Sequence, residues 1–356
     1  MNLPCESGAF AARVVAWQLV HGRNHLPWQN TRDPYRVWLS EIMLQQTQVV
    51  TVVGYFERFL ERFPNVNSLA QASLDDVLGL WSGLGYYSRA RNLHRCAQDV
   101  MALHGGLFPT TAEALQTLPG IGRSTAAAIA SLCFDQRVAI LDANVKRVVS
   151  RVVGFDADLA LATNVRALWD AATSLLPNGA ATSAMPRYTQ GMMDLGATVC
   201  LPKKPACSVC PVRPDCVAGA EGDPHRYPVR TRTLKRSSES QWMLWAQTEE
   251  GAVWLSKRPT PGVWAGLHCL PLFANEDDLR SAVPAAMRQH LQPAPAFTHV
   301  LTHKDLHLHP WRLTLPAKAY QAVQWDAGQW IASDAWPTLG LPAPIRKLLQ
   351  AMSPGR

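Results

Sequence analysis

The chain has 356 residues, of which 47% are hydrophobic and 17% charged, so it is long enough for two globular domains. Its formal net charge of +7 favours a polyanionic partner. There is no run of about 18 apolar residues and no secretory signal sequence, which argues against a membrane-spanning or exported protein and favours a soluble, cytoplasmic one.

Helical periodicity begins near the N-terminus, where Phe10, Val14 and Trp17 recur on one face. After a turn at 26–29, Asp33-Pro34 marks the start of a second helix. Glu41 lies on this helix among large apolar residues that oppose its ionisation, so a protonated acid near neutral pH becomes possible. The alternative is an amphipathic-helix glutamate with its carboxylate in water.

Further helices are expected over 47–63, 73–81 and 88–104, the first of them capped by Thr47 and ended by Pro64. Between the last two lies a loop, 83–87, that holds two glycines and two tyrosines. Aromatic side chains on such a loop can stack on bases or wedge between them, although packed loop tyrosines are the more common case.

Residues 110–134 predict a helical hairpin. Thr110 and Glu113 form a capping-box pair for its first helix, Pro119-Gly120 ends that helix, and a second helix begins near Gly122. Glycine allows close approach of another molecule to the backbone, and the free N–H groups of the second helix can hold a phosphate. The plain alternative is an ordinary turn between two helices.

Asp142 follows an apolar run, 138–141, and is expected at the N-cap of a helix that buries Val145, Val148 and Val149. A carboxylate at this position would face whatever the hairpin holds. Because aspartate is a common N-cap residue, a role in capping alone is the alternative. Helices are also expected over 165–175 and 188–199.

Four cysteines are clustered, with six, two and five residues between successive members: Cys200, Cys207, Cys210 and Cys216. Four thiolates at this spacing suit either a tetrahedral zinc ion or an iron–sulfur cluster, and the spacing alone does not decide between them. The other four cysteines are scattered and are interpreted as packing residues: Cys5, Cys96, Cys133 and Cys269.

The character of the sequence changes after the cysteines. Residues 221–240 are rich in Gly, Pro, Ser and basic residues and predict a linker between a helical domain over 1–220 and a second domain over 241–356. The second domain is expected to be α+β. Its elements are strands over 242–248, 252–258, 297–302 and 306–315 and helices over 276–291 and 345–352.

Several local strings, in this order along the chain, resemble the MutY family of adenine DNA glycosylases, which is related to endonuclease III: WLSEIMLQQTQV, LWSGLGYYSRARNLH, LPGIGRSTA, ILDANVKRV and the cysteine loop. Residues 258–271 resemble the MutT-like domain of that family. The resemblance covers nearly the whole chain. It implies an all-α helix-hairpin-helix glycosylase domain with an iron–sulfur cluster loop, followed by a smaller α+β MutT/Nudix-like domain. It also implies one [4Fe-4S] cluster per chain, held by the four clustered cysteines.

The family resemblance implies a monofunctional enzyme of base excision repair. It would flip adenine mispaired with 8-oxoguanine or guanine out of double-stranded DNA and hydrolyse its N-glycosidic bond. Glu41 would protonate the adenine, Asp142, favoured as the anion at its helix N-terminus, would stabilise the sugar cation, and Asn144 would orient the centre. The residues implied for the adenine pocket are Trp28, Leu44 and Gln46, with Gln29 where the family often has arginine.

The same resemblance implies the DNA contacts. The contacting residues would be Tyr86 as a wedge, Gly120, Gly122 and Ser124 of the hairpin, and Lys146 at a phosphate. Ser124 stands where the bifunctional relatives have a Schiff-base lysine, so strand cleavage is not expected. Thr302 and His303 would recognise 8-oxoguanine, beside Leu301 where the family has phenylalanine. The C-terminal domain has no Glu-rich metal box and is expected to read a base without hydrolysing nucleotides.

Two other interpretations remain. One is an endonuclease III-like pyrimidine glycosylase with lyase activity, and the other is a non-catalytic iron–sulfur DNA-binding protein. Under the favoured interpretation the chain acts as a monomer in the cytoplasm, associated with the nucleoid and not with a membrane. His299, His307 and His309 superficially suggest a zinc site, but alternate strand positions commonly place histidines on a solvated face.

Overall fold

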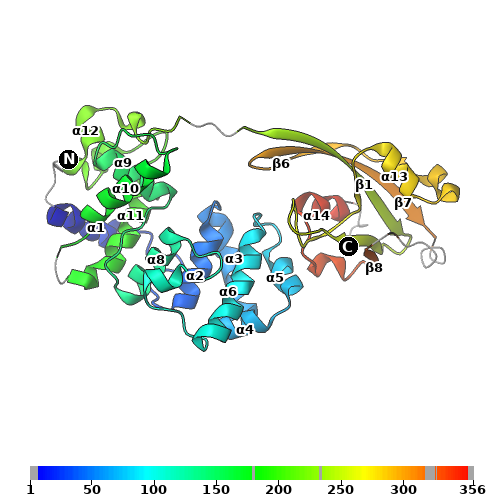
Figure 1. The fold of residues 1–356 in the computed structure, drawn as a ribbon, viewed down its shortest axis with the longest axis horizontal. Coiled ribbons are helices and arrows are strands. Elements are labelled where there is room, and N and C mark those ends of the chain that lie inside the picture. The colour runs from blue at the N-terminus through cyan, green and yellow to red at the C-terminus, as the bar shows by residue number, and fades with distance from the viewer. Residues whose placement is uncertain (1–6, 179–180, 232–234, 317–324, 326, 352–356) are drawn as a thin grey trace. The chain divides into compact units, whose positions relative to one another are not determined.

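The computed structural model describes residues 7–178, 181–231, 235–316, 325 and 327–351 (Figure 1). Cys5, Arg232 of the predicted linker and Met352 of the predicted last helix lie outside this range. The chain divides into two compact units, which are described separately below: Met1–Ala70 with Arg95–Thr233, and Gln71–His94 with Leu234–Arg356.

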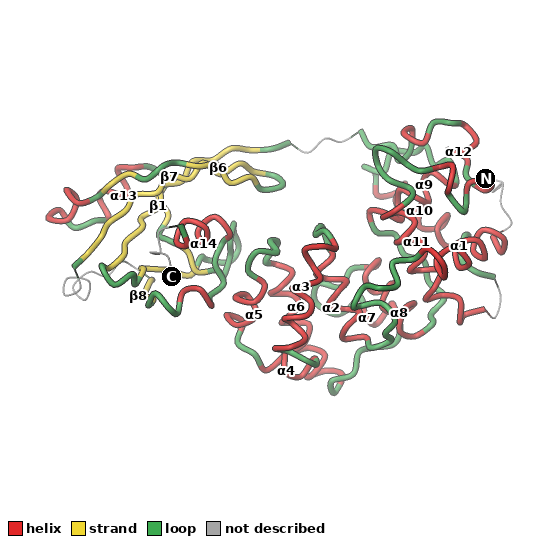
Figure 2. The backbone as a smooth tube through the Cα atoms, turned by 180° about the vertical axis from the view of Figure 1, so that it is seen from behind, coloured by secondary structure: helices red, strands yellow, loops and turns green. Residues whose placement is uncertain are grey.

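The described part of the first unit is helical, and helices dominate this part of the tube in Figure 2. Helix α11 lies at its centre and packs against α1, α8 and α9. Their shared core is apolar and includes Phe10, Val148 and Leu195. The α-helices of this unit are α1 (Ser7–His21), α2 (Pro34–Leu44), α3 (Val49–Arg62), α4 (Val66–Gln71), the C-terminal part of α6 (Ser88–His104), α7 (Ala112–Leu115), α8 (Arg123–Phe134), α9 (Ala143–Val152), α10 (Ala162–Ser174), α11 (Met185–Thr198) and α12 (Val217–Glu221).

Helix starts follow local capping chemistry, with two corrections. The Asp33 carboxylate accepts a hydrogen bond from the backbone N–H of Tyr35 at the start of α2. Thr47 does not cap α3, because that helix begins after Gln48 and has no side-chain cap. Thr111, not Thr110, caps α7, since its hydroxyl accepts from the N–H of Ala114.

The described part of the second unit contains one mixed sheet of eight strands, in which β1 lies between β2 and β7. Strands β1 and β7 run parallel from the Ser237–Lys304 pair to the Thr248–Leu315 pair, and the other pairs are antiparallel. The strands are β1 (Ser237–Thr248), β2 (Val253–Lys257), β3 (His268–Cys269), β4 (Leu272–Phe273), β5 (Gln292–Pro293), β6 (Phe297–Val300), β7 (Lys304–Leu315) and β8 (Gly328–Ile331).

One helix of the second unit is shorter than the sequence suggested. Helix α13 (Glu276–Ala282) ends early, so the single helix expected over 276–291 is wrong. Pro284 follows the end of α13, and residues 285–290 form a 3-10 helix instead. Strand β1 begins at Ser237, inside the range expected as linker. Helix α14 (Ala343–Gln350) closes the described unit, and the predicted α+β class is confirmed.

The second unit also includes residues 71–94, which precede it in sequence by more than a hundred positions. This segment holds α5 (Leu74–Trp81), the loop 83–87 and the start of α6. The carbonyl of Leu341 accepts hydrogen bonds from the hydroxyls of Ser82, at 3.1 Å, and Tyr87, at 2.9 Å. Lys257 forms an ion pair with Asp75 at 2.7 Å. These contacts make the tyrosine loop part of the C-terminal unit.

Candidate active site and cluster loop

Glu41 of α2 lines a small cavity of about 40 Å³ in the first unit, and most of the other walls are apolar. Burial, followed by the nearby charge of Asp142, raises the pKa of Glu41 to about 7. The predicted protonated acid near neutral pH is therefore consistent with its surroundings. The residues lining the cavity are Arg23, Leu26, Trp28, Val37, Ser40, Glu41, Leu44, Val49, Leu132, Gln190 and Met193.

Two of the three residues expected in the adenine pocket line this cavity. Trp28 is buried and packs edge-to-face on Phe56 at 5.4 Å between ring centroids. Leu44 lies at the end of α2. Gln46, in contrast, is exposed in the turn after α2 with a φ of 57° and is not among the lining residues.

The cavity has a polar side that sequence reasoning missed. The carboxylate of Asp194 on α11 is fully buried and accepts from the Arg23 guanidinium at 2.7 Å and from the Gln190 amide at 3.0 Å. Asp194 thus fixes two hydrogen-bonding side chains at the cavity wall. A single acid within the apolar pattern of 188–199 was the available clue.

Gln29 lies beside this region and lines a neighbouring cavity of about 420 Å³. Both polar atoms of its side chain are buried without a hydrogen-bond partner among the described residues. The residue thus occupies the wall of a cavity next to the one that holds Glu41, since Trp28 and Gln190 line both.

Asp142 occupies the predicted N-cap of α9, where its carboxylate accepts from the N–H of Val145 at 2.6 Å. Burial nevertheless raises its pKa, against the opposing effects of backbone N–H groups, Arg147 and Lys146. The expected preference of Asp142 for the anion at its helix N-terminus is therefore opposed by desolvation, which has the larger effect on its pKa. The backbone donors remain a difference from Glu41, whose pKa is set by burial and a like charge.

Asn144 is the second residue of α9, and its side-chain carbonyl accepts from Arg147 at 3.0 Å. Arg147 also donates to the carbonyls of Gly196, at 2.6 Å, and Cys200, at 2.8 Å. The sequence patterns did not single out Arg147, yet this side chain connects α9 to α11 and to the cysteine loop. Lys146 is half-buried, and burial together with Arg230 lowers its pKa.

The predicted hairpin is formed by α7 and α8. Gly120 has a φ of 77°, which favours glycine, and Gly122 is the exposed N-cap of α8 with nothing within 4 Å of the position of an added Cβ. The Ser124 hydroxyl accepts from the N–H of Leu141 at 3.1 Å. Ser124 therefore ties α8 to the chain immediately before Asp142, a contact that the sequence did not indicate.

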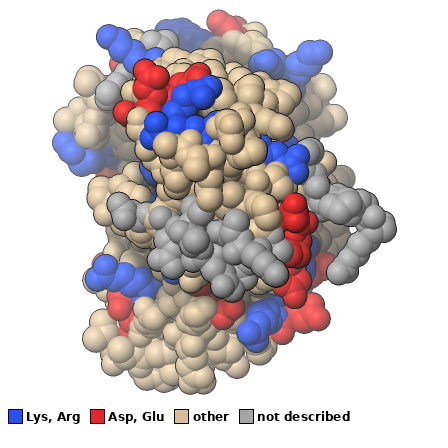
Figure 3. Space-filling model, turned by 90° about the vertical axis from the view of Figure 1, so that its right-hand side faces the viewer, with Lys and Arg blue, Asp and Glu red and all other residues tan. Residues whose placement is uncertain are grey.

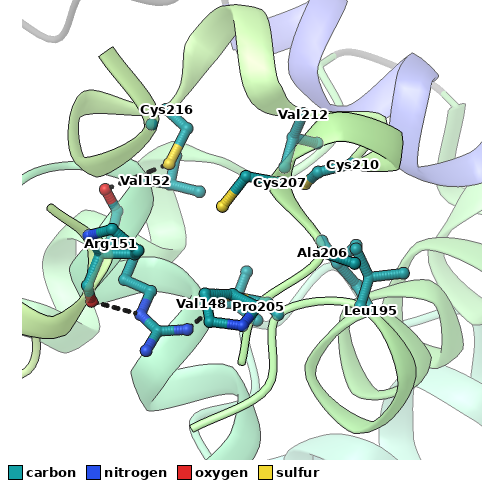
Figure 4. A pocket seen from close by; sticks show the side chains of 14 residues that line it. Val148, Arg151, Val152, Leu195, Pro205, Ala206, Cys207, Cys210, Val212 and Cys216 are labelled. Carbon is teal, nitrogen blue, oxygen red and sulfur yellow. Dashed lines mark hydrogen bonds between the residues drawn. The ribbon is translucent and has the colours of Figure 1, made fainter. Parts of the chain in front are cut away.

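The four clustered cysteines line one cavity, and Figure 4 shows Cys207, Cys210 and Cys216 around it. All four are free thiols, and the apolar side chains around them include Val148, Leu195 and Val212. Within the described ranges no three His, Cys, Asp or Glu side chains form a ready single-ion site. The soft donor set and the shared cavity fit a thiolate-bound metal group.

Tyr86 lies in the second unit, in the loop 83–87, with a φ of 48° and 42% of its surface exposed. Its hydroxyl is 2.6 Å from that of Thr302. Both residues, with His303 and Leu301, line a pocket of about 670 Å³ whose other wall includes Trp264. The residues expected to contact the base opposite adenine are thus brought together within one unit.

The three neighbouring histidines have separate contacts. The His307 ring nitrogens meet the hydroxyls of Ser238 and Thr298. His309 stacks on Trp242 with 4.5 Å between centroids. His299 packs beside Trp264, and burial lowers its pKa.

Charge and hydropathy add two observations on the described residues. Basic and acidic side chains are interspersed on the face drawn in Figure 3, so the net positive charge is not gathered there. No helix in the described part of the chain is long and apolar enough to cross a membrane.

Comparison with known proteins defines the class. Residues 39–169 match the HhH-GPD superfamily of base excision DNA repair proteins, and residues 242–351 match the NUDIX domain. The structure of a thermostable thymine-DNA glycosylase superposes with a TM-score of 0.52 at 28% identity, over 60% of this chain and 97% of that one. The chain is thus an HhH-GPD base excision repair glycosylase with an appended Nudix-like domain.

Two curated relatives narrow the class. The adenine DNA glycosylase of Buchnera aphidicola is 35% identical over 343 residues, which are 96% of this chain and 97% of the relative. The adenine DNA glycosylase of Mus musculus is 46% identical over 220 residues, 59% of this chain and 42% of the relative. The chain belongs to the adenine DNA glycosylase family, as the sequence motifs predicted, and is a hydrolytic DNA N-glycosylase.

Proposed function

We propose that this glycosylase removes adenine mispaired with 8-oxoguanine or guanine in double-stranded DNA and leaves an intact abasic site. The observation that carries the proposal is the pairing of Glu41, which lines a largely apolar cavity, with Asp142 at the N-cap of α9, close enough for their charges to interact. Cleavage of a glycosidic bond requires an acid at the leaving group and a carboxylate near the sugar.

Glu41 is the proposed acid. With a pKa of about 7, about half of the Glu41 carboxyl groups carry a proton at pH 7, and this proton is donated to N7 of the flipped adenine. The N-glycosidic bond then breaks and its electron pair goes to the purine. Glu41, now deprotonated, takes a proton from the water that attacks the sugar, which restores the acid.

Asp142 is the proposed stabiliser of the positively charged sugar. Its ionised carboxylate is favoured by the Val145 N–H and by the nearby cations Arg147 and Lys146, while burial opposes ionisation. The positive charge that develops on the sugar would attract the Asp142 carboxylate. The carboxylate would therefore stabilise the transition state more than the neutral substrate. Asn144, fixed by Arg147, orients this side of the centre.

The adenine pocket is proposed to be the cavity lined by Trp28 and Leu44, with Gln190 as an added hydrogen-bonding group. An amide offers both a donor and an acceptor, which matches the edge of adenine. Gln46 is proposed to contact the DNA near the pocket entrance, because it is exposed and does not line the cavity.

DNA is proposed to be held by the hairpin and by the second unit. The exposed helix start at Gly122, with Gly120 and Ser124, would bind phosphate, and Lys146 would add a cationic contact. Tyr86 would wedge into the base stack, while Thr302 and His303 would meet 8-oxoguanine. Ser124 has no amine, so no Schiff base forms at this position.

One [4Fe-4S] cluster per chain is the proposed occupant of the cavity lined by Cys200, Cys207, Cys210 and Cys216. Thiolate ligands from four positions would tie the loop together and hold it against α9. Residues 221–240 are proposed to connect the domains 1–220 and 241–356, and the enzyme to act as a monomer on nucleoid DNA.

The decisive experiment is excision from duplexes that pair adenine with 8-oxoguanine, analysed with and without alkali. Strand breaks are expected only after alkali, and both Glu41→Gln and Asp142→Asn should lose at least 100-fold in single-turnover rate. The exposed Glu57→Gln is the matched control and should keep the wild-type rate.

Three outcomes would contradict the proposal. Full activity of both active-site variants would reject the proposed roles of Glu41 and Asp142. Strand cleavage without alkali, or excision of thymine glycol in place of adenine, would favour the endonuclease III-like reaction. Binding without turnover would favour a non-catalytic DNA-binding protein.

A further inference from the structure

Arg151 of α9 is a buried charge that the glycosylase reaction does not use. Only 2% of its surface is exposed, and its side chain points from α9 toward the cysteine cavity (Figure 4). Its own backbone carbonyl lies 3.4 Å from the sulfur of Cys216. Burying a guanidinium is costly unless it is hydrogen-bonded and its charge is compensated.

The hydrogen bonds of Arg151 join two stretches of the loop region. Its guanidinium donates to the carbonyls of Leu201 at 2.8 Å and Pro202 at 3.2 Å, immediately after the first cysteine. It also donates to the carbonyls of Pro224 at 2.8 Å and Tyr227 at 3.3 Å, beyond the last cysteine. One side chain thereby closes the cysteine loop from both ends.

The charge of Arg151 is not compensated by a carboxylate. None of the ion pairs among the described residues includes Arg151. It is also the one charged residue among those that line the cavity. Its remaining side-chain partner is the sulfur of Cys200, at 3.3 Å from Nη1. Thiolate sulfur is thus the available source of negative charge.

From this uncompensated buried cation we infer that Arg151 is a positioning residue for the metal group of the cysteine loop, and supplies its counter-charge. The inference rests on the cluster proposed above. Arg151 stabilises the Cys200 thiolate through a charge-assisted N–H···S hydrogen bond and holds the loop closed. Because its positive charge favours the state with one more electron, Arg151 also raises the reduction potential of the cluster.

The test compares Arg151→Gln and Arg151→Lys with the wild-type full-length protein. Arg151→Gln should lose the bound iron roughly 10-fold faster or more in the presence of a chelator, and the potential of the remaining cluster should become more negative. Arg151→Lys keeps the positive charge but lacks the five donors of the guanidinium. Its reduction potential should therefore stay closer to the wild-type value than its retention of iron does. Exposed Arg166→Gln on α10 is the matched control and should match wild type in both measurements.

The outcomes separate this inference from the cofactor proposal. Wild-type protein with one zinc ion, or with no iron, would reject the cluster itself. Wild-type protein with four irons, together with unchanged iron retention and potential in Arg151→Gln, would overturn only the role of Arg151. Equal losses in the Gln and Lys variants, with no shift in potential, would reduce Arg151 to a packing role.

Discussion

At the scale of single residues, Glu41 lies in surroundings that oppose the ionisation of its carboxyl group. Glu41 has a pKa of about 7 in the folded protein, whereas the ordinary value is 4.5. The folded state therefore binds more protons than the unfolded state between these two values, so this group lowers stability as the pH rises through that range.

Glu41→Gln should consequently stabilise the protein at alkaline pH. The gain in the free energy of unfolding should be smallest near pH 4, grow between about pH 4.5 and 7, and reach about 3 kcal/mol by pH 8. Urea titrations at several pH values measure this difference, with Glu57→Gln as the exposed control. A pH-independent difference would contradict the raised pKa.

The same residue predicts the pH dependence of catalysis. Because the proposed mechanism uses the acid form of Glu41 to protonate adenine, the single-turnover excision rate should decline as the pH rises above about 7. Rapid-quench assays from pH 6 to 9 test this expectation. A rate that is flat across the range would mean that Glu41 does not transfer the proton in the measured step.

Sequence patterns predicted the positions of Glu41 and Asp142, but they did not predict the hydrogen-bonding partners of charged residues elsewhere in the unit. The apolar neighbours of Glu41 and the N-cap position of Asp142 are local properties, and both are present in the structure. Asp194 and Arg151 instead bind residues that are distant in the sequence, and their roles depend on those partners. A charged residue at such a position in a helix looks like an ordinary surface residue until the partner is known.

At the scale of elements, the close packing of α9 on α11 holds Asp142, the proposed catalytic carboxylate. A Cβ added at Gly196 would lie 2.8 Å from the Asn144 side chain and 3.2 Å from its backbone. The small residue is therefore needed for α11 to approach the first turn of α9, directly after Asp142.

Gly196→Ala should cost about 1–3 kcal/mol of stability and slow adenine excision, because backbone atoms must move. Gly54→Ala on α3 is the matched control, since the added Cβ would meet only the flexible end of Arg58, at 3.3 Å, and alanine favours helix. Thermal unfolding and single-turnover assays measure the two effects. Equal behaviour of the two variants would show that the contact is unimportant.

Helix existence was easier to predict than helix ends or strand ends. The apolar periodicity of α9 marks a buried face without any knowledge of the neighbours. The caps predicted at Thr47 and Thr110 each missed by one residue. Thr110 and Thr111 are equally suitable by residue type, whereas α3 begins after Gln48 without any side-chain cap. The C-terminal half of the helix expected over 276–291 failed because Pro284 outweighed the apolar pattern.

At the scale of the whole molecule, sequence order and spatial grouping differ. The two predicted classes of domain are confirmed, but residues 71–94 group with the C-terminal unit. The glycine and tyrosine content of loop 83–87 suggested base contact or packed tyrosines and gave no sign of bonds to Leu341 or Thr302. Contacts between residues so far apart in the chain produce no periodic pattern in a single sequence.

Gly340→Ala tests this grouping, because its Cβ would lie 2.7 Å from the Leu78 side chain and 3.2 Å from its backbone. Amide hydrogen exchange should accelerate in 74–87 and near residue 340, and remain unchanged in α9 and α11. Gly54→Ala should leave exchange in 74–87 at the wild-type rate. Unaltered exchange in that segment of Gly340→Ala would contradict the grouping.

The bond between the Tyr86 and Thr302 hydroxyls has a practical consequence for protein engineering. A chimaera that exchanges only the Nudix-like domain with that of a relative would separate a matched pair of surfaces, although its junction would fall at an apparently neutral boundary. Transplanting residues 71–94 together with 234–356 would take Tyr86 and Thr302 from the same parent protein.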